Sequence, residues 1–310
     1  MTEPDKTVTE AKDQDKFRFQ IVYLVPILAS MIFGLGCAYL LIPQQGNAIP
    51  VTPIPESTPG APFGNAIYFV ILVAISATLF YILLKRKSKK IIKGLIIVAM
   101  TTASLLLSVV YLSAIFASLP DWSIFVLIPL SIIITVLFDL AIFRFGSIPR
   151  NVAVVAVGGA LGIFFGFSIP LYSAVIILIF LAVYDVIAVY RGPVGKIAQS
   201  QSASGSGSGS GLDELQGLSF SFKDIQMGLG DLVFYSMLTG AMFFSFPQTM
   251  FFGFPESILP TVAAIIGILA GSIITFFMLT KRGIFPGLPF PIMLGLTAGL
   301  ITGFLILPLL

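Results

Sequence analysis

Histidine is absent from the sequence, and cysteine occurs once, at Cys37. Without histidine, the chain cannot form a serine–histidine catalytic triad or dyad, nor an HExxH zinc site. A single cysteine cannot form an internal disulfide, so Cys37 is expected to be a small buried apolar residue. Any hydrolysis by this chain must therefore use carboxylates.

Charged residues are also scarce, at 10% of the chain, whereas 57% of the residues are hydrophobic and the mean hydropathy is +1.04. This composition lies far outside that of soluble globular domains. Nine stretches are apolar and long enough to span a bilayer as helices. The sequence therefore predicts an all-α polytopic membrane protein with nine transmembrane helices. The spans are expected at residues 18–42, 64–84, 94–117, 122–143, 151–169, 171–190, 225–246, 257–280 and 288–309.

Basic residues are missing from every second loop of this nine-span arrangement. All 17 Lys and Arg residues fall on one side of it, and the loops 43–63, 118–121 and 247–256 contain none. By the positive-inside rule, we expect a cytoplasmic N-terminus and an exoplasmic C-terminus. The net charge of +3 is explained by this topology and by contact with the anionic lipid bilayer, so no nucleic-acid partner is indicated.

The chain divides at a segment rich in serine and glycine. Residues 1–17 predict a disordered cytoplasmic tail, and residues 18–196 hold spans one to six. Residues 197–222 predict a flexible cytoplasmic loop, and residues 223–310 hold spans seven to nine. Within the loop, Ser204–Gly211 alternates serine and glycine strictly, which is typical of an engineered linker.

Glycines recur at four-residue spacing in three of the expected spans. This small-xxx-small pattern predicts faces on which two helices pack closely together. The three series are Gly158/Gly162/Gly166, Gly267/Gly271 and Gly295/Gly299/Gly303.

Two aspartates, Asp185 and Asp231, lie in segments that are otherwise apolar enough to cross the bilayer. A charge there costs about 2.5–3.5 kcal/mol on insertion scales, so such residues usually face a bundle interior and serve a function. At 1.5 Å per residue, Asp185 lies about 9 Å from Arg191 and Asp231 about 12 Å from Lys223, which places both at a similar depth. Two facing carboxylates can share one proton and activate water for peptide hydrolysis.

A third element is expected at the same depth. Pro286, Pro289 and Pro291 prevent a regular helix and favour extended backbone. Non-helical backbone inside a membrane is tolerated where it is buried in protein or lines an aqueous cavity. Its unpaired backbone groups would be suited to bind an extended substrate by strand addition. Gly228 and Gly230 allow a substrate or a helix to approach the backbone beside Asp231.

The residues alone leave three functions open. The two aspartates suit an aspartyl protease, a cation- or proton-conducting channel or transporter, or a scaffold in which they form a structural polar pair. A transporter predicts ion-dependent flux without cleavage, and a scaffold predicts that both aspartates are dispensable. A third acid, Asp139, lies five residues before Arg144 and is expected to be a paired or snorkelling residue.

Three motifs resemble those of a known family. The sequences Tyr184-Asp185, Gly228-Leu229-Gly230-Asp231 and Pro286-Gly287-Leu288-Pro289 are similar to the YD, GxGD and PALP motifs of presenilins. Presenilins are intramembrane aspartyl proteases with nine spans and the same expected orientation. The likeness is specific around the three motifs, and it is greatest to an archaeal presenilin homologue. Gly287 stands where the family usually has alanine.

The resemblance implies an endopeptidase that cleaves transmembrane segments of substrate proteins. It implies that Asp185 and Asp231 are catalytic, that Tyr184 and the glycines at 228 and 230 with Leu229 support the site, and that Pro286–Pro289 binds substrate. It implies no metal and no organic cofactor, and an archaeal cell membrane as the location. Homo-oligomers and accessory subunits are left open.

Overall fold

The computed structural model describes residues 21–46, 51–86, 88–117, 124–190, 219–222, 225–247, 249–251, 254–282 and 285–306. The longer helices are α2 (Val25–Leu41), α3 (Ala61–Lys85), α4 (Lys89–Phe116), α5 (Ile124–Phe143), α6 (Ser147–Ser168), α7 (Leu171–Tyr190), α9 (Leu229–Ser245), α10 (Ile258–Arg282) and α11 (Pro289–Ile301). Short 3-10 helices η1 (Ile21–Leu24) and η2 (Ile42–Gln44) flank α2, and the π-helix η5 (Thr302–Ile306) follows α11. The predicted tail 1–17 and the Gly/Ser segment lie outside the described residues.

The helices lie close to the predicted spans. Seven of the described helices are long and apolar enough to cross a membrane, and α9 and α11 are shorter apolar helices. The protein is therefore a mainly helical, multi-pass membrane protein. The count of nine crossings and the orientation of the termini stay predictions.

Four short strands depart from the all-α prediction. Strands β1 (Ser219–Phe222) and β2 (Ile225–Gly228) form one antiparallel ribbon, and β3 (Met250–Phe251) and β4 (Phe254–Pro255) form another. The prediction that residues 225–228 begin a helix was wrong, because Gly228 is extended, with φ −67° and ψ 140°, and pairs with Ser219. Glycine has a low helix propensity, so pairing with β1 decides the local structure.

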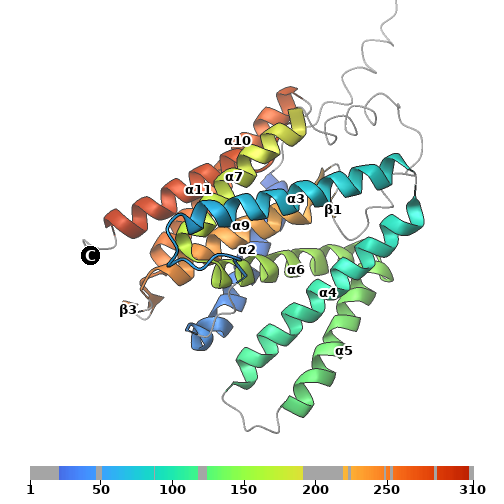
Figure 1. The fold of residues 1–310 in the computed structure, drawn as a ribbon, viewed down its shortest axis with the longest axis horizontal. Helices are drawn as coiled ribbons and strands as arrows, with labels where there is room; N and C mark the ends of the chain where they lie inside the picture. The colour runs from blue at the N-terminus through green and yellow to red at the C-terminus, as the bar shows by residue number, and fades with distance from the viewer. Residues whose placement is uncertain are drawn as a thin grey trace, which may run out of the picture.

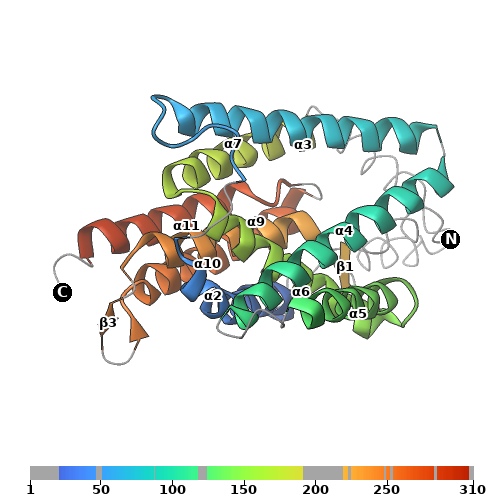
Figure 2. The ribbon, with the colours of Figure 1, turned by 60° about the horizontal axis from the view of Figure 1, so that its bottom comes forward.

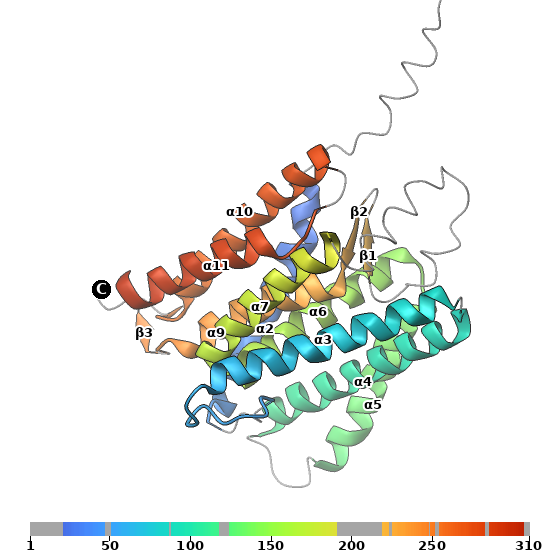
Figure 3. The same ribbon diagram turned by 45° about the horizontal axis from the view of Figure 1, so that its top comes forward.

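Helix α9 lies inside the bundle. It packs against α2 and α6 on one side and against α10 and α11 on another. In Figure 1, α4 and α5 form a pair that extends away from the other helices. Figure 3 shows α10 and α11 side by side, with α7 next to them and α3 beside α7. The β1–β2 ribbon lies at one end of the bundle, and β3 and the C-terminus lie at the other (Figure 2).

Several of the predicted glycines lie where helix backbones touch. A methyl group added at Gly162 would lie 2.4 Å from the Val233 carbonyl oxygen on α9, and one added at Gly166 would lie 2.6 Å from the Ala241 nitrogen. One added at Gly267 on α10 would lie 2.5 Å from a carbonyl oxygen of α11. Gly159, which the predicted series did not include, brings α6 equally close to α2, 2.4 Å from the Ser30 carbonyl oxygen. These contacts confirm close helix packing between α6 and α9 and between α10 and α11.

Candidate active site

Asp185 lies near the C-terminal end of α7, on a part of that helix that is not buried. Its carboxylate is partly buried, whereas Val183 and Ile187 beside it are each 54% exposed. The Leu288 N–H donates a hydrogen bond to Asp185 Oδ2 over 3.0 Å. Asp185 is therefore held by a backbone donor of a segment about a hundred residues away in the sequence.

Asp231 lies in the first turn of α9, directly after β2. A helix begins here because Gly228 serves as an extended N-cap, and a carboxylate near a helix N-terminus is favoured by the helix dipole. A methyl group added at Gly287 would lie 3.3 Å from Asp231 Oδ2 and 3.6 Å from Oδ1. The α-carbon of Gly287 therefore packs directly against the Asp231 carboxyl group.

The two aspartates thus meet at one short segment, Pro286–Pro289, which we call the PGLP segment. Asp185 accepts a hydrogen bond from its Leu288 N–H, and the Asp231 carboxyl group lies beside Gly287, 3.3 Å from where an added methyl group would sit. The two carboxyl groups are close enough to interact electrostatically. The structure therefore brings together the two acids and the proline-rich segment that the sequence singled out.

Three polar backbone groups of Gly287 and Leu288 are already occupied. The Leu288 N–H is bonded to Asp185, and the Leu288 carbonyl accepts from the Ile292 N–H at the start of α11. The Gly287 carbonyl accepts a hydrogen bond of 3.0 Å from the Tyr235 hydroxyl. Proline has no N–H, so Pro286 and Pro289 add no donor. Strand addition at Gly287 or Leu288 would first require these bonds to open.

Tyr235 is a member of the site that the sequence interpretation missed. It is 3% exposed and lies four residues after Asp231, one turn further along the same face of α9. The i,i+4 spacing from a membrane aspartate is the signal that would have identified it. Without a structure, an isolated tyrosine in an apolar helix is indistinguishable from a core residue.

The remaining predicted residues surround the two acids. Gly228 and Gly230 are exposed and leave the backbone beside Asp231 open, while Leu229 packs against Gly158 of α6. Tyr184 is partly buried, and among the described residues its hydroxyl has no hydrogen-bond partner. Support of the site by Tyr184 therefore stays a prediction.

Asp139 lies outside this site. Its Oδ2 accepts a hydrogen bond of 2.7 Å from the Thr101 hydroxyl across the α4–α5 pair. Its Oδ1 is buried and has no hydrogen-bond partner within the described part of the chain. The expected pairing of Asp139 is thus made with a neutral hydroxyl.

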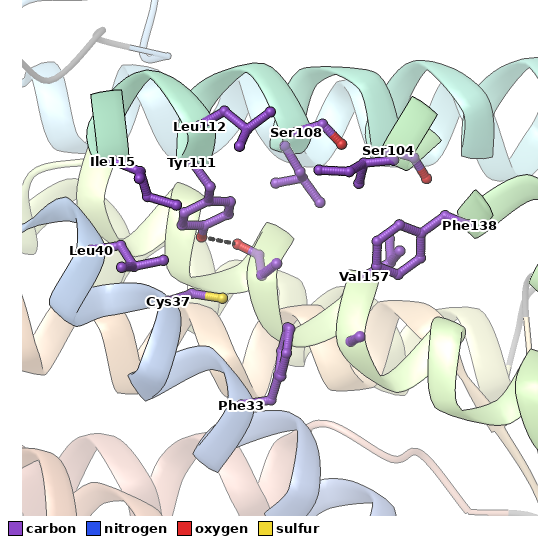
Figure 4. A pocket seen from close by; sticks show the side chains of 14 residues that line it. Phe33, Cys37, Leu40, Ser104, Ser108, Tyr111, Leu112, Ile115, Phe138 and Val157 are labelled. Atoms are coloured by element: carbon purple, nitrogen blue, oxygen red, sulfur yellow. Dashed lines mark hydrogen bonds between the residues drawn. The ribbon is translucent and has the colours of Figure 1, made fainter. Parts of the chain in front are cut away.

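Two cavities lie beside α6. One has a volume of about 200 Å³ and lies among α2, α4, α5 and α6 (Figure 4). The other, of about 430 Å³, lies between α2 and α6 and shares Phe33 and Ala156 with the first. Neither is lined by the two candidate acids or the PGLP segment. In the described residues, no group of three or more Cys, Asp or Glu side chains could hold a metal ion.

Comparison with known proteins agrees with the geometry of the site. No curated protein matches the sequence significantly. Two solved structures of a presenilin family intramembrane aspartate protease have the same fold. The one in space group C222 has a TM-score of 0.60 and 19% identity over 90% of this chain and 97% of the other. The one in space group P2 has a TM-score of 0.59 and 21% identity over 94% and 99%.

A family model identifies the chain itself. The model for the family of signal-peptide peptidases and presenilin aspartyl proteases matches residues 35–196, which is over half of the sequence. The matched region contains Asp185 and ends before Asp231 and the PGLP segment, so those two elements rest on the motifs and the geometry described above. The chain therefore belongs to the signal-peptide peptidase and presenilin family of aspartyl proteases.

Proposed function

We propose that this protein is an endopeptidase that hydrolyses peptide bonds within the transmembrane helices of other proteins, with Asp185 and Asp231 as its catalytic pair. The observation that carries the proposal is the meeting of both carboxyl groups at the PGLP segment. They come from separate helices, α7 and α9, and family membership supports an aspartyl protease. No residue outside the pair is needed to activate water.

The chemistry follows from one proton shared by two acids. The ionised carboxylate takes a proton from water, and the oxygen of that water attacks the carbonyl carbon of the scissile bond. The protonated carboxyl group gives its proton to the carbonyl oxygen, forming a neutral tetrahedral diol. Its collapse breaks the C–N bond as the nitrogen receives the proton of the pair, and one diol hydroxyl returns its own proton to the pair as it becomes the new carbonyl oxygen. The pair then holds one proton again.

Access to the pair is provided by the unburied end of α7. Tyr190, like Val183 and Ile187, is about half exposed there, so a substrate helix has a lateral route to Asp185 from the lipid. A helical substrate must unwind locally, because its carbonyls are shielded by its own hydrogen bonds. An extended stretch could then pair with the edge of β2 that no described strand occupies, and β2 leads directly to Asp231.

The PGLP segment has a role in this cycle. Its hydrogen bond to Asp185 orients that carboxylate while the site is empty. When an extended substrate enters, its backbone can exchange with the bonds that now occupy Gly287 and Leu288. The segment is therefore proposed to bind substrate after a local rearrangement, with its flanking prolines keeping it non-helical.

We also propose nine crossings, with a cytoplasmic N-terminus and an exoplasmic C-terminus. The basic residues on one side of the spans support this orientation. The β1–β2 ribbon, which precedes α9, and β3, which follows it, lie at opposite ends of the bundle (Figure 2), and this supports a crossing by α9. The catalytic pair would then act near the cytoplasmic face.

The decisive experiment is cleavage of a purified transmembrane substrate in detergent or liposomes. Asp185→Asn and Asp231→Asn should each abolish cleavage, because neither variant can share a proton between two carboxyl groups. Asp139→Asn is the matched control, since it neutralises a third membrane aspartate that lies away from the site and bonds Thr101. The control should cleave at the wild-type rate.

Persistent cleavage by either variant of the pair would refute the dyad. Ion flux through liposomes that depends on both aspartates, without any cleavage, would instead establish the transporter alternative. Mass spectrometry of the products should place the cut inside the transmembrane segment of the substrate rather than in its flanking loops.

A further inference from the structure

One peptide group connects Tyr235 to Asp185. The carbonyl of Gly287 accepts from the Tyr235 hydroxyl over 3.0 Å, and the N–H of Leu288 donates to Asp185 Oδ2 over 3.0 Å. The Gly287 carbonyl and the Leu288 N–H belong to one planar, trans peptide unit, in which they point in opposite directions. Holding the carbonyl therefore aims the N–H.

We propose that Tyr235 is a positioning residue for the peptidase reaction, whose hydroxyl directs the Leu288 N–H at Asp185. This inference rests on the proposed function. Tyr235 is nearly fully buried, so its hydroxyl acts through the peptide group rather than on substrate. Neither the family match nor the motifs assign this role, since Tyr235 lies outside the matched residues 35–196 and outside the three motifs.

The peptide group needs such a restraint because of the residues around it. Gly287 has no side chain to limit its rotation, and its α-carbon must stay against Asp231. Beyond it, Leu288 is fixed through its carbonyl, which accepts from Ile292. The Gly287 side of the peptide is therefore the loose side, and Tyr235 is the group that holds it.

Helix α10 lies close to the tyrosine. Ser272 of α10 lies near the Tyr235 hydroxyl, but the Ser272 hydroxyl donates its one proton to the Ile268 carbonyl, over 2.8 Å. Next to Ser272, Gly271 allows α10 to touch the backbone of Phe290 and Pro291 at the start of α11. The Gly287 carbonyl is therefore the acceptor of the Tyr235 hydroxyl proton.

Tyr235→Phe removes only the hydroxyl and can be compared with a closely matched variant. Tyr111 is another buried tyrosine whose hydroxyl donates to a backbone carbonyl, that of Ala160 over 2.7 Å (Figure 4). It lies on α4, beyond α6 from the two aspartates. Tyr111→Phe therefore loses the same kind of hydrogen bond, with a similar effect on stability but no link to Asp185.

The proposal predicts different kinetics for the two variants. For Tyr235→Phe, kcat should fall about 3- to 10-fold, the range of one hydrogen bond, while KM for a transmembrane substrate stays within a factor of two. For Tyr111→Phe, both constants should match the wild type.

Hydrogen exchange provides a readout that does not need catalysis. Between residues 285 and 291 only Phe285, Gly287, Leu288 and Phe290 carry backbone N–H groups, so exchange in this peptide reports on the PGLP segment. Tyr235→Phe should accelerate it several-fold, and Tyr111→Phe should leave it unchanged. Equal kcat for the two tyrosine variants, or equal exchange, would overturn the positioning role. Loss of cleavage by the wild type, or retention of cleavage by Asp185→Asn, would instead overturn the proposed function.

Discussion

At the scale of single residues, this chain has Gly287 where the motif that it resembles usually has alanine. Its φ is not in the left-handed region, so the backbone accepts a side chain here. An added methyl would lie 3.3 Å from Asp231 Oδ2, a contact that a shift of a few tenths of an ångström relieves. The position is therefore limited by space at the carboxyl group rather than by backbone conformation.

We expect Gly287→Ala to retain activity and Gly287→Val to lose most of it. The alanine methyl fits after a small shift, so kcat/KM should stay within about three-fold of the wild type. The branched valine adds two further methyl groups, and overpacking of this kind costs about 1–3 kcal/mol, or roughly 5- to 150-fold. Steady-state cleavage assays measure both, and an equally active valine variant would show that Asp231 is not confined by residue 287.

The catalytic pair also predicts a bell-shaped dependence of kcat/KM on pH. The reaction needs one carboxyl group ionised and one protonated. At low pH both are protonated and no base is present, and at high pH both are ionised and no acid is present. A profile measured on stably folded protein should therefore fall on both sides of its maximum, and a rate still rising above about pH 9 would contradict the shared proton.

The two acids and the prolines of the site could be predicted from the sequence because each differs in kind from the residues around it. Asp185 and Asp231 interrupt apolar segments, and Pro286 and Pro289 interrupt a helix. Tyr235 could not be predicted in this way, because a tyrosine is common in an apolar helix. Its role depends on a hydrogen bond to Gly287, which no sequence pattern indicates. For the same reason, the sequence could not predict that the backbone groups of Gly287 and Leu288 are already hydrogen-bonded.

At the scale of elements, the α6–α9 contact determines where Asp231 lies. Gly158, Gly162 and Gly166 remove side chains from one face of α6, and α9 fills that face with its backbone. The spacing of the glycines predicted a close contact, but not which helix would be the partner. By contrast, the start of α9 was misplaced, because apolar residues such as Ile225 suit a strand as well as a helix.

Gly162→Ala should destabilise the protein, whereas Gly36→Ala should not. A methyl group at Gly162 would lie 2.4 Å from the Val233 carbonyl oxygen and 2.5 Å from the Ser236 side chain, so α6 and α9 must separate. Overpacking costs about 1–3 kcal/mol. A methyl at Gly36 of α2 meets nothing within 4 Å, and alanine favours the helix by about 0.5–1 kcal/mol.

Thermal unfolding in one detergent measures both glycine variants. Cleavage assays on the folded fraction of Gly162→Ala should also show a lower rate, because a displaced α9 carries Asp231 away from Gly287. Identical midpoints for the two variants would mean that the close contact between α6 and α9 is absent in the membrane.

At the scale of the whole molecule, the orientation in the bilayer is set by charge rather than by packing. Helix packing is the same whichever face of the bundle meets the cytoplasm, so packing does not set the orientation. The Lys and Arg residues lie on one side of the expected spans, so their placement does. This is why the sequence predicts orientation more directly than the fold does.

Single-cysteine labelling tests that orientation, starting from a Cys37→Ala background. Cysteines at Glu10 and Ser210 should react with a membrane-impermeant maleimide only from the cytoplasmic side. Cysteines at Ala48 and Ser118 should react only from the outside, because two of the predicted loops without basic residues contain them. Labelling of Glu10 and Ser210 variants from opposite sides would show that the number of crossings between them is odd.

Within the described residues, helix α7 is held more firmly near its start than near Asp185. Near its start, the Ser173 hydroxyl donates to Glu56 and accepts from Asn65, over 3.0 Å in the latter case, so this end is tied to α3 and the preceding loop. Its buried residues stop at Ala182, before Asp185. Asp185 is 12 residues from Ser173, about 18 Å along the axis, so a tilt of 5° about the fastened end moves the carboxylate by about 1.6 Å. Rotation of α7 about Ser173 would therefore move Asp185 relative to the Leu288 N–H, and the hydrogen bond between them opposes that movement.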